Sequence, residues 1–205
     1  LIRKKPRSKI IRGFFLKGKM VTWLPYAGIG VAIVALAWFA ATFNRFVRGR
    51  NRLREAWSGI DVQLKRRHDL VPRLIECVRA YRDHERSVLE NVTAARSRAM
   101  SAQGVEQAGQ AETTLAQNLR ALVAIGEAYP DLKANQTFQQ LSVALIEVED
   151  QIQYARRYYN GAVRDFNTLV ESFPSAVVAR LSGFASQPFF SIESAVERQG
   201  PEVRL

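Results

Sequence analysis

The chain has few of the residues from which catalytic and metal sites are most often built. Its 205 residues include one cysteine and two histidines. The single thiol, Cys77, excludes an intrachain disulfide. Neither His68 nor His84 has a second histidine four residues on, and no HExxH motif occurs. A metal site would need ligands gathered by the tertiary fold, so we expect no metal and no cofactor.

The chain also lacks the patterns that accompany catalysis. It has no glycine-rich phosphate-binding motif and no recognisable pairing of a nucleophile with a base. We therefore predict that the protein is not an enzyme and has no catalytic residues. The opposite hypothesis requires His68, His84 and Glu85 to converge in a water-filled pocket.

Acidic residues are absent from residues 1–20, which carry eight lysines and arginines. Residues 44–205 carry 22 bases against 19 acids, so the formal charge of +11 belongs mainly to the tail. Basic tails of this kind face anionic lipid or set membrane orientation. Residues 87–205 have a net charge of −3 and no basic–aromatic interleaving, so no nucleic acid is expected as a partner. Two interpretations stay open: a translated, lipid-binding tail, or a protein that starts at Met20.

Charge of either sign is absent from residues 21–43. As a helix rising ~1.5 Å per residue, this stretch would extend about 34 Å, more than the ~30 Å hydrocarbon core of a bilayer. A cleaved signal peptide would have an apolar region of only about 7–15 residues. We predict an uncleaved, single-pass transmembrane helix that anchors the chain in a lipid bilayer. The side of the membrane on which the rest of the chain lies depends on whether the basic tail is translated, because positive charge favours the cytoplasmic side.

No segment alternates as a strand does, and after residue 44 apolar residues recur at steps of three and four. This pattern predicts an all-α fold, in which an antiparallel four-helix bundle follows the transmembrane helix. The expected helices cover residues 44–68, 70–101, 106–129 and 133–173. Pro174 ends the last of them, and residues 174–205 form a C-terminal segment that is apolar at first and then loose.

The first boundary of the bundle is expected in the stretch LKRRHDLVPRLIEC, residues 64–77. Pro72 cannot donate to the carbonyl of His68, and Asp69 is suited to cap a helix that begins at Leu70. These features predict a chain reversal at residues 67–70. The alternative is a bundle of three long helices with the first one kinked at Pro72.

Two sets of polar residues are candidates for binding or for structural pairing. The bases and acid beside Pro72 are either a solvated helix end or a docking patch for an acidic partner. The docking patch would consist of Arg66, Arg67, His68, Asp69 and Pro72. Glu85 falls on an apolar stripe, where it is expected to pair with a base. Asn160 and Asn167 are expected to form interhelical hydrogen bonds that fix register.

Several longer stretches carry a family resemblance. They are IDVQLKRRHDLVPRLIE at residues 60–76, then YRDHE and VTAAR, and towards the C-terminus YYNGAVRDFN, FPSAVVARLSGF and FF. Through them residues 43–190 resemble the LemA family of bacterial membrane-anchored proteins. The resemblance implies a single-pass membrane protein with an antiparallel helical bundle, and it carries over no catalytic residues. Arg73 departs from the asparagine that many members have there.

These observations favour a non-enzymatic adaptor or scaffold, held in the inner membrane of a bacterium and bound to another envelope protein. The alternative is a structural, self-associating membrane protein that forms homo-oligomers. The hypothesis of an enzyme or a metal-binding protein is less favoured.

Overall fold

The computed structural model describes residues 15–80 and 86–191, with side chains from residue 25 onward. The chain divides into two compact units, Leu1–Arg45 and Phe46–Leu205. Within the described ranges every regular element is a helix. His84 and Glu85, most of the predicted basic tail, and residues 192–205 lie outside the described residues.

The first unit contains the beginning of helix α1 (Phe15–Arg79). Its large apolar side chains are turned outward: more than half of the surface of Tyr26, Val31 and Leu36 is exposed. A soluble core helix of this composition would bury those side chains against protein. Among the described helices, α1 alone is long and apolar enough to cross a membrane. The predicted anchor therefore has both the length and the outward apolar surface that a bilayer requires.

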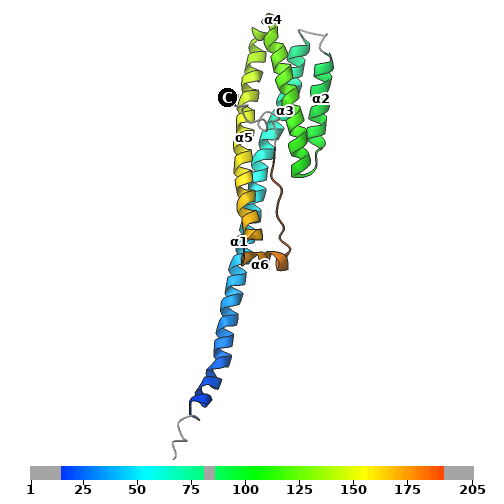
Figure 1. The fold of residues 1–205 in the computed structure, drawn as a ribbon. Coiled ribbons are helices and arrows are strands. Elements are labelled where there is room, and N and C mark those ends of the chain that lie inside the picture. Colours follow the sequence, from blue (N-terminus) through cyan, green and yellow to red (C-terminus); the bar gives the residue numbers. More distant parts are fainter. Residues whose placement is uncertain (1–14, 81–85, 192–205) are drawn as a thin grey trace, which may run out of the picture. The chain divides into compact units, whose positions relative to one another are not determined.

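The second unit is an antiparallel helical bundle (Figure 1). Its long helices are the remainder of α1, α2 (Arg86–Ser101), α3 (Gly104–Ala128) and α5 (Gln136–Glu171). The short helix α4 (Pro130–Lys133) connects α3 to α5 at one end of the bundle, and α6 (Ser175–Ser182) follows α5 at the opposite end. The all-α prediction and the expectation of four long bundle helices are confirmed.

The apolar stripes of the long helices meet in a core. Val71 and Leu74 of α1 are buried with Val92 of α2, Leu119 of α3 and Phe138 of α5. Buried residues recur at steps of three and four within the helices, so each helix presents an apolar face. In α2 they are Leu89, Val92, Ala95 and Ala99, and in α3 they include Leu115, Leu119 and Leu122.

The predicted reversal at residues 67–70 is wrong, because α1 continues through Asp69 and Pro72 to Arg79. The alternative, three long helices with the first one kinked at Pro72, is right that a single helix passes through Pro72. Its number of helices is wrong, because α1 ends at Arg79 and a separate helix, α2, begins at Arg86. Pro72 leaves the carbonyl oxygen of His68 without its usual helical donor. Arg96 of α2 supplies that donor, with its Nε 2.9 Å from the oxygen. A tertiary contact therefore makes the proline tolerable inside the helix.

Candidate functional site

The residues of the predicted docking patch point in different directions, because successive side chains on a helix are about 100° apart. The side chain of Arg67 is fully buried in the bundle and His68 is also buried. Arg66 and Asp69 are exposed, and Pro72 is half-buried. A guanidinium with no exposed surface cannot meet a partner protein directly. Arg67 and His68 therefore belong to the interior, and Arg66, Asp69 and the exposed part of Pro72 remain available as surface contacts.

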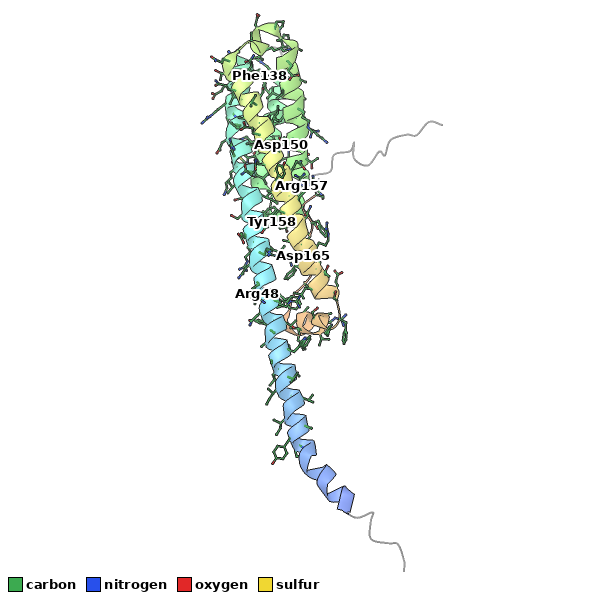
Figure 2. The ribbon with its side chains drawn as sticks, turned by 90° about the vertical axis from the view of Figure 1, so that its left-hand side faces the viewer. Arg48, Phe138, Asp150, Arg157, Tyr158 and Asp165 are labelled. Atoms are coloured by element: carbon green, nitrogen blue, oxygen red, sulfur yellow. The ribbon has the colours of Figure 1, made fainter. Side chains whose placement is uncertain are left out.

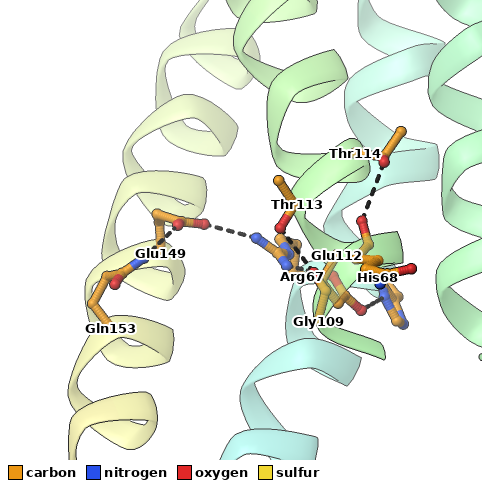
Figure 3. Close-up of polar contacts among 9 residues, drawn as sticks. Arg67, His68, Gly109, Glu112, Thr113, Thr114, Glu149 and Gln153 are labelled. Carbon is orange, nitrogen blue, oxygen red and sulfur yellow. Dashed lines mark hydrogen bonds and ion pairs between the residues drawn. The ribbon is translucent and has the colours of Figure 1, made fainter. Parts of the chain in front are cut away.

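Arg67 lies at the centre of a buried charged cluster that joins three helices (Figure 3). Its Nη2 donates to Oε2 of Glu112 on α3, which is itself buried. Its Nη1 donates to Oε2 of Glu149 on α5, 2.7 Å away. The Nε2 of His68 lies 2.7 Å from the second oxygen of Glu112. The cluster therefore ties α1 to both α3 and α5 at one level of the bundle.

Such a cluster acts mainly on specificity of packing. Taking ions out of water costs several kcal/mol each, so a buried ion pair adds little net stability, but breaking it leaves a buried charge unpaired. Any shift of α3 or α5 along α1 would separate Arg67 from Glu112 or Glu149. We infer that the cluster fixes the register of α3 and α5 on α1.

The sequence predicts a buried acid that pairs with a base, but at Glu85, which lies outside the described residues, and not at Glu112 or Glu149. A signal for Glu112 was present: it lies three residues before Leu115, so the apolar stripe of Leu115, Leu119 and Leu122 extends back onto it. Glu149 is a quarter exposed and stands beside the buried Val148, and no comparable signal marks it.

Arg66 takes part in a looser, exposed contact. Its Nη2 lies 3.8 Å from Oε2 of Glu147 on α5, and both side chains are more than half exposed. Exposed pairs of this kind contribute little to stability, about 0–1 kcal/mol. The pair does show that the outward faces of α1 and α5 adjoin at this level.

Asn160 and Asn167 were expected to form hydrogen bonds to another helix, and this prediction is wrong. Each amide holds the backbone of the extended segment that follows α6. Asn167 accepts from the N–H of Gln187 at 2.7 Å and donates to its carbonyl at 2.9 Å. Asn160 does the same with Phe190, at 2.9 and 3.0 Å. The two side chains thus clamp residues 187–190 against α5.

The clamp requires that the spacing of the two asparagines along α5 match the spacing of the two residues that they hold. Seven residues of α-helix rise about 10.5 Å, and three residues of extended chain cover about 10 Å. Asn160 and Asn167 can therefore each reach one peptide of the segment. The Tyr159 hydroxyl donates, at 3.3 Å, to the carbonyl of Pro188, which lies between the two clamped residues. Burial raises the pKa of that hydroxyl. The ring of Phe190 is fully buried, edge-on to Trp57 of α1.

The thiol of Cys77 does not have the lowered pKa of a catalytic cysteine. Burial raises the pKa of the Cys77 thiol, which lowers its thiolate fraction at neutral pH. Among the side chains that the structure describes, no group of three or more His, Cys, Asp or Glu residues could hold a metal ion.

A cleft of about 270 Å³ opens between α3 and α5. Its walls are mainly apolar and include Leu119 and Val123 of α3 with Leu145 and Ile146 of α5. Glu149, which holds Arg67, also lines it. Ile146 is also exposed to solvent, so the cleft adjoins the outward face of α5.

Comparison with known proteins gives a consistent result. The profile of the LemA family matches residues 56–205. The Protein LemA of Metamycoplasma hominis is 30% identical over 139 residues, covering 67% of this chain and 63% of that protein. Magnetosome protein MamQ 2 of Paramagnetospirillum magneticum is 22% identical over 80% of this chain and 72% of its own length. Magnetosome protein MamQ of Magnetospirillum gryphiswaldense is 21% identical, with coverage of 79% and 71%.

Proposed function

Because this chain belongs to the LemA family, we propose that it is a membrane-anchored helical scaffold that binds another envelope protein through the outward face of α5. The chain spans 63% of the length of the LemA protein that it matches. The partner and the site of binding are therefore argued from this chain's own surface. We place the protein in the inner membrane of a bacterium, with residues 21–43 as its single anchor.

The observation that carries the proposal is a row of large apolar side chains left open to solvent on α5. Val143, Ile146, Tyr154 and Tyr158 are each more than half exposed. Their spacing of three, eight and four residues places them on one side of the helix, opposite the buried stripe. They form two exposed apolar pairs that are about 12 Å apart along the helix, with Asp150 between them. Exposed apolar side chains rimmed by polar groups are typical of a protein interaction site.

The charges along the same face define what would fit it. Glu147 and Asp150 lie among the apolar residues in the first half of α5, and Arg157 lies in the second half (Figure 2). The guanidinium of Arg157 lies 4.5 Å from the ring centre of Tyr154, which orders both side chains. A complementary partner presents an apolar ridge with bases opposite Glu147 and Asp150 and an acid opposite Arg157. One side chain of that ridge could enter the cleft beside Ile146.

Crosslinking in intact membranes, followed by mass spectrometry, tests this proposal. We expect an Ile146→Ser, Tyr154→Ser variant to lose a crosslinked partner that the wild-type chain captures. Met100→Ser is the matched control, because Met100 of α2 is also a large apolar residue and is 57% exposed. Both variants change only exposed side chains, so each should stay folded, as circular dichroism would verify.

The identity of the crosslinked species decides between the two interactions considered. A different protein, lost in the α5 variant and kept in the Met100 control, supports the scaffold. A second copy of this chain, captured through the same face, supports the self-associating alternative instead. Crosslinks that are equal in the variant and the wild type would contradict the assignment of this face.

A further inference from the structure

Helix α6 has apolar side chains on both of its faces. Val178 and Ala179 are buried against the bundle. Val177 and Leu181, four residues apart and therefore on one side of the helix, are exposed, and Leu181 is 74% exposed. Phe173, in the turn that leads into α6, is 86% exposed. Large apolar side chains on the outward side of such a helix call for a second apolar environment beyond the one that the bundle provides.

The position of α6 within the second unit indicates what that environment is. The residue after its C-terminal cap, Phe184, stacks on Phe46 of α1 with the ring centres 4.8 Å apart. Arg50 of α1 lies 5.5 Å from the centre of the Phe184 ring. Helix α6 therefore lies at the end of the bundle where Phe46 begins the second unit (Figure 1).

Chain connectivity relates this end of the bundle to the apolar run. The run ends at Phe43, three residues before Phe46. Three residues span at most about 10 Å whatever their conformation. A bilayer that holds residues 21–43 therefore has its surface within about 10 Å of Phe46. The polar layer on each side of the hydrocarbon core is itself about 5–8 Å thick.

Most of the exposed charges described near this end are basic, and the acid Glu171 lies two residues before Phe173. Arg180 of α6 is exposed beside Leu181, and Arg48 and Arg52 of α1 are exposed within six residues of Phe46. Each base close to an anionic bilayer adds to the attraction between the chain and the membrane surface. Apolar side chains flanked by bases are the composition of helices that lie in the membrane interface.

We propose that α6 is an interfacial membrane-binding element, in which Phe173, Val177 and Leu181 enter the headgroup layer of the membrane that holds the anchor. The inference rests on the anchor in the proposed function but concerns a different surface from the α5 face. Its consequence is that the bundle has a second attachment to the bilayer, which restricts its tilt relative to the membrane.

Depth-dependent quenching of a fluorescent label tests this element in the full-length chain. In a Cys77→Ser background, Leu181→Cys carries an NBD label, and the protein is reconstituted into vesicles of phosphatidylcholine with phosphatidylglycerol. Lipids with a nitroxide near the headgroup should quench this label at least twofold. The matched control is an Ala134→Cys label, because Ala134 is exposed next to α4 at the other end of the bundle. We expect that label to remain unquenched.

A second variant separates the role of α6 from an effect of the label. Adding Phe173→Ser and Val177→Ser should abolish most of the quenching at residue 181, because the apolar face is then lost. A label at residue 181 that stays unquenched, in vesicles that carry the protein on flotation, would overturn the role of α6 while leaving the anchor intact. Self-quenching that rises with protein density, without quenching by lipid, would overturn it in favour of a second copy. A chain that fails to float would refute the anchor and this inference with it.

Discussion

At the scale of single residues, the bundle depends on charged side chains that are paired inside it. Arg67 gives both Nη groups to carboxylates, one of them buried. Its neighbour Arg66 has a looser contact in solvent. The sequence shows two adjacent arginines and does not by itself reveal which one is inside. The structure separates them because α1 continues through the region in which a turn was expected.

Replacing Arg67 should therefore have a much larger effect than replacing Arg66. We expect Arg67→Met to lower the free energy of unfolding by about 3–5 kcal/mol, since it leaves Glu112 buried without its cation. Arg66→Met should change it by less than about 1 kcal/mol. The double variant Arg67→Met, Glu112→Leu should recover much of the loss. Urea denaturation measures all three, and equal effects of the two arginine variants would contradict the cluster.

At the scale of elements, α1 and the C-terminal segment both depend on side chains of other helices. Helix periodicity predicted the existence of the long bundle helices, because an apolar stripe is a local property of the sequence. The break predicted at residues 67–70 was wrong because Pro72 is compensated by Arg96, which is 24 residues away in the sequence. The partners of Asn160 and Asn167 were missed for a similar reason. An asparagine's spacing does not reveal whether it faces a helix or an extended chain.

The compensation of Pro72 can be measured as a double-mutant cycle. We expect Arg96→Met to cost about 1–3 kcal/mol in the wild-type chain, because the His68 carbonyl loses its donor. In a Pro72→Ala background the helix supplies its own N–H, so the same change should cost less than half as much. Thermal or urea unfolding of the four proteins gives the coupling. A cost of Arg96→Met that is independent of residue 72 would refute this explanation.

The asparagine clamp should control the exchange of individual amides. We expect Asn160→Ala to speed hydrogen exchange at the Phe190 N–H by about tenfold or more, because it removes hydrogen bonds worth about 1–3 kcal/mol. Asn118→Ala is the control, since Asn118 bonds to the Thr114 carbonyl of its own helix. Exchange at Phe190 that is unchanged in Asn160→Ala, measured by NMR, would be inconsistent with the clamp.

At the scale of the whole molecule, the described residues expose large apolar side chains on the first unit, on the outward face of α5, and at α6. The side chains at Tyr26, Val31 and Leu36 on the first unit are exposed, as are Ile146 and Tyr154 on the second. Composition alone predicted the first of these surfaces, because an uncharged run of this length has few other uses. The second was hidden in the sequence, since a stripe on the outer face of α5 resembles part of the core until burial is known.

The measurement that tests the anchored bundle most directly is alkaline carbonate extraction of membranes containing the full-length chain, beside a chain that begins at Asn44. We predict that the full-length protein stays in the membrane pellet, because residues 21–43 are held in the hydrocarbon core. The shorter chain should be released into the supernatant with its helical circular dichroism intact, since the bundle core lies after Phe46. Release of the full-length protein by carbonate would contradict the account of a scaffold anchored through these residues.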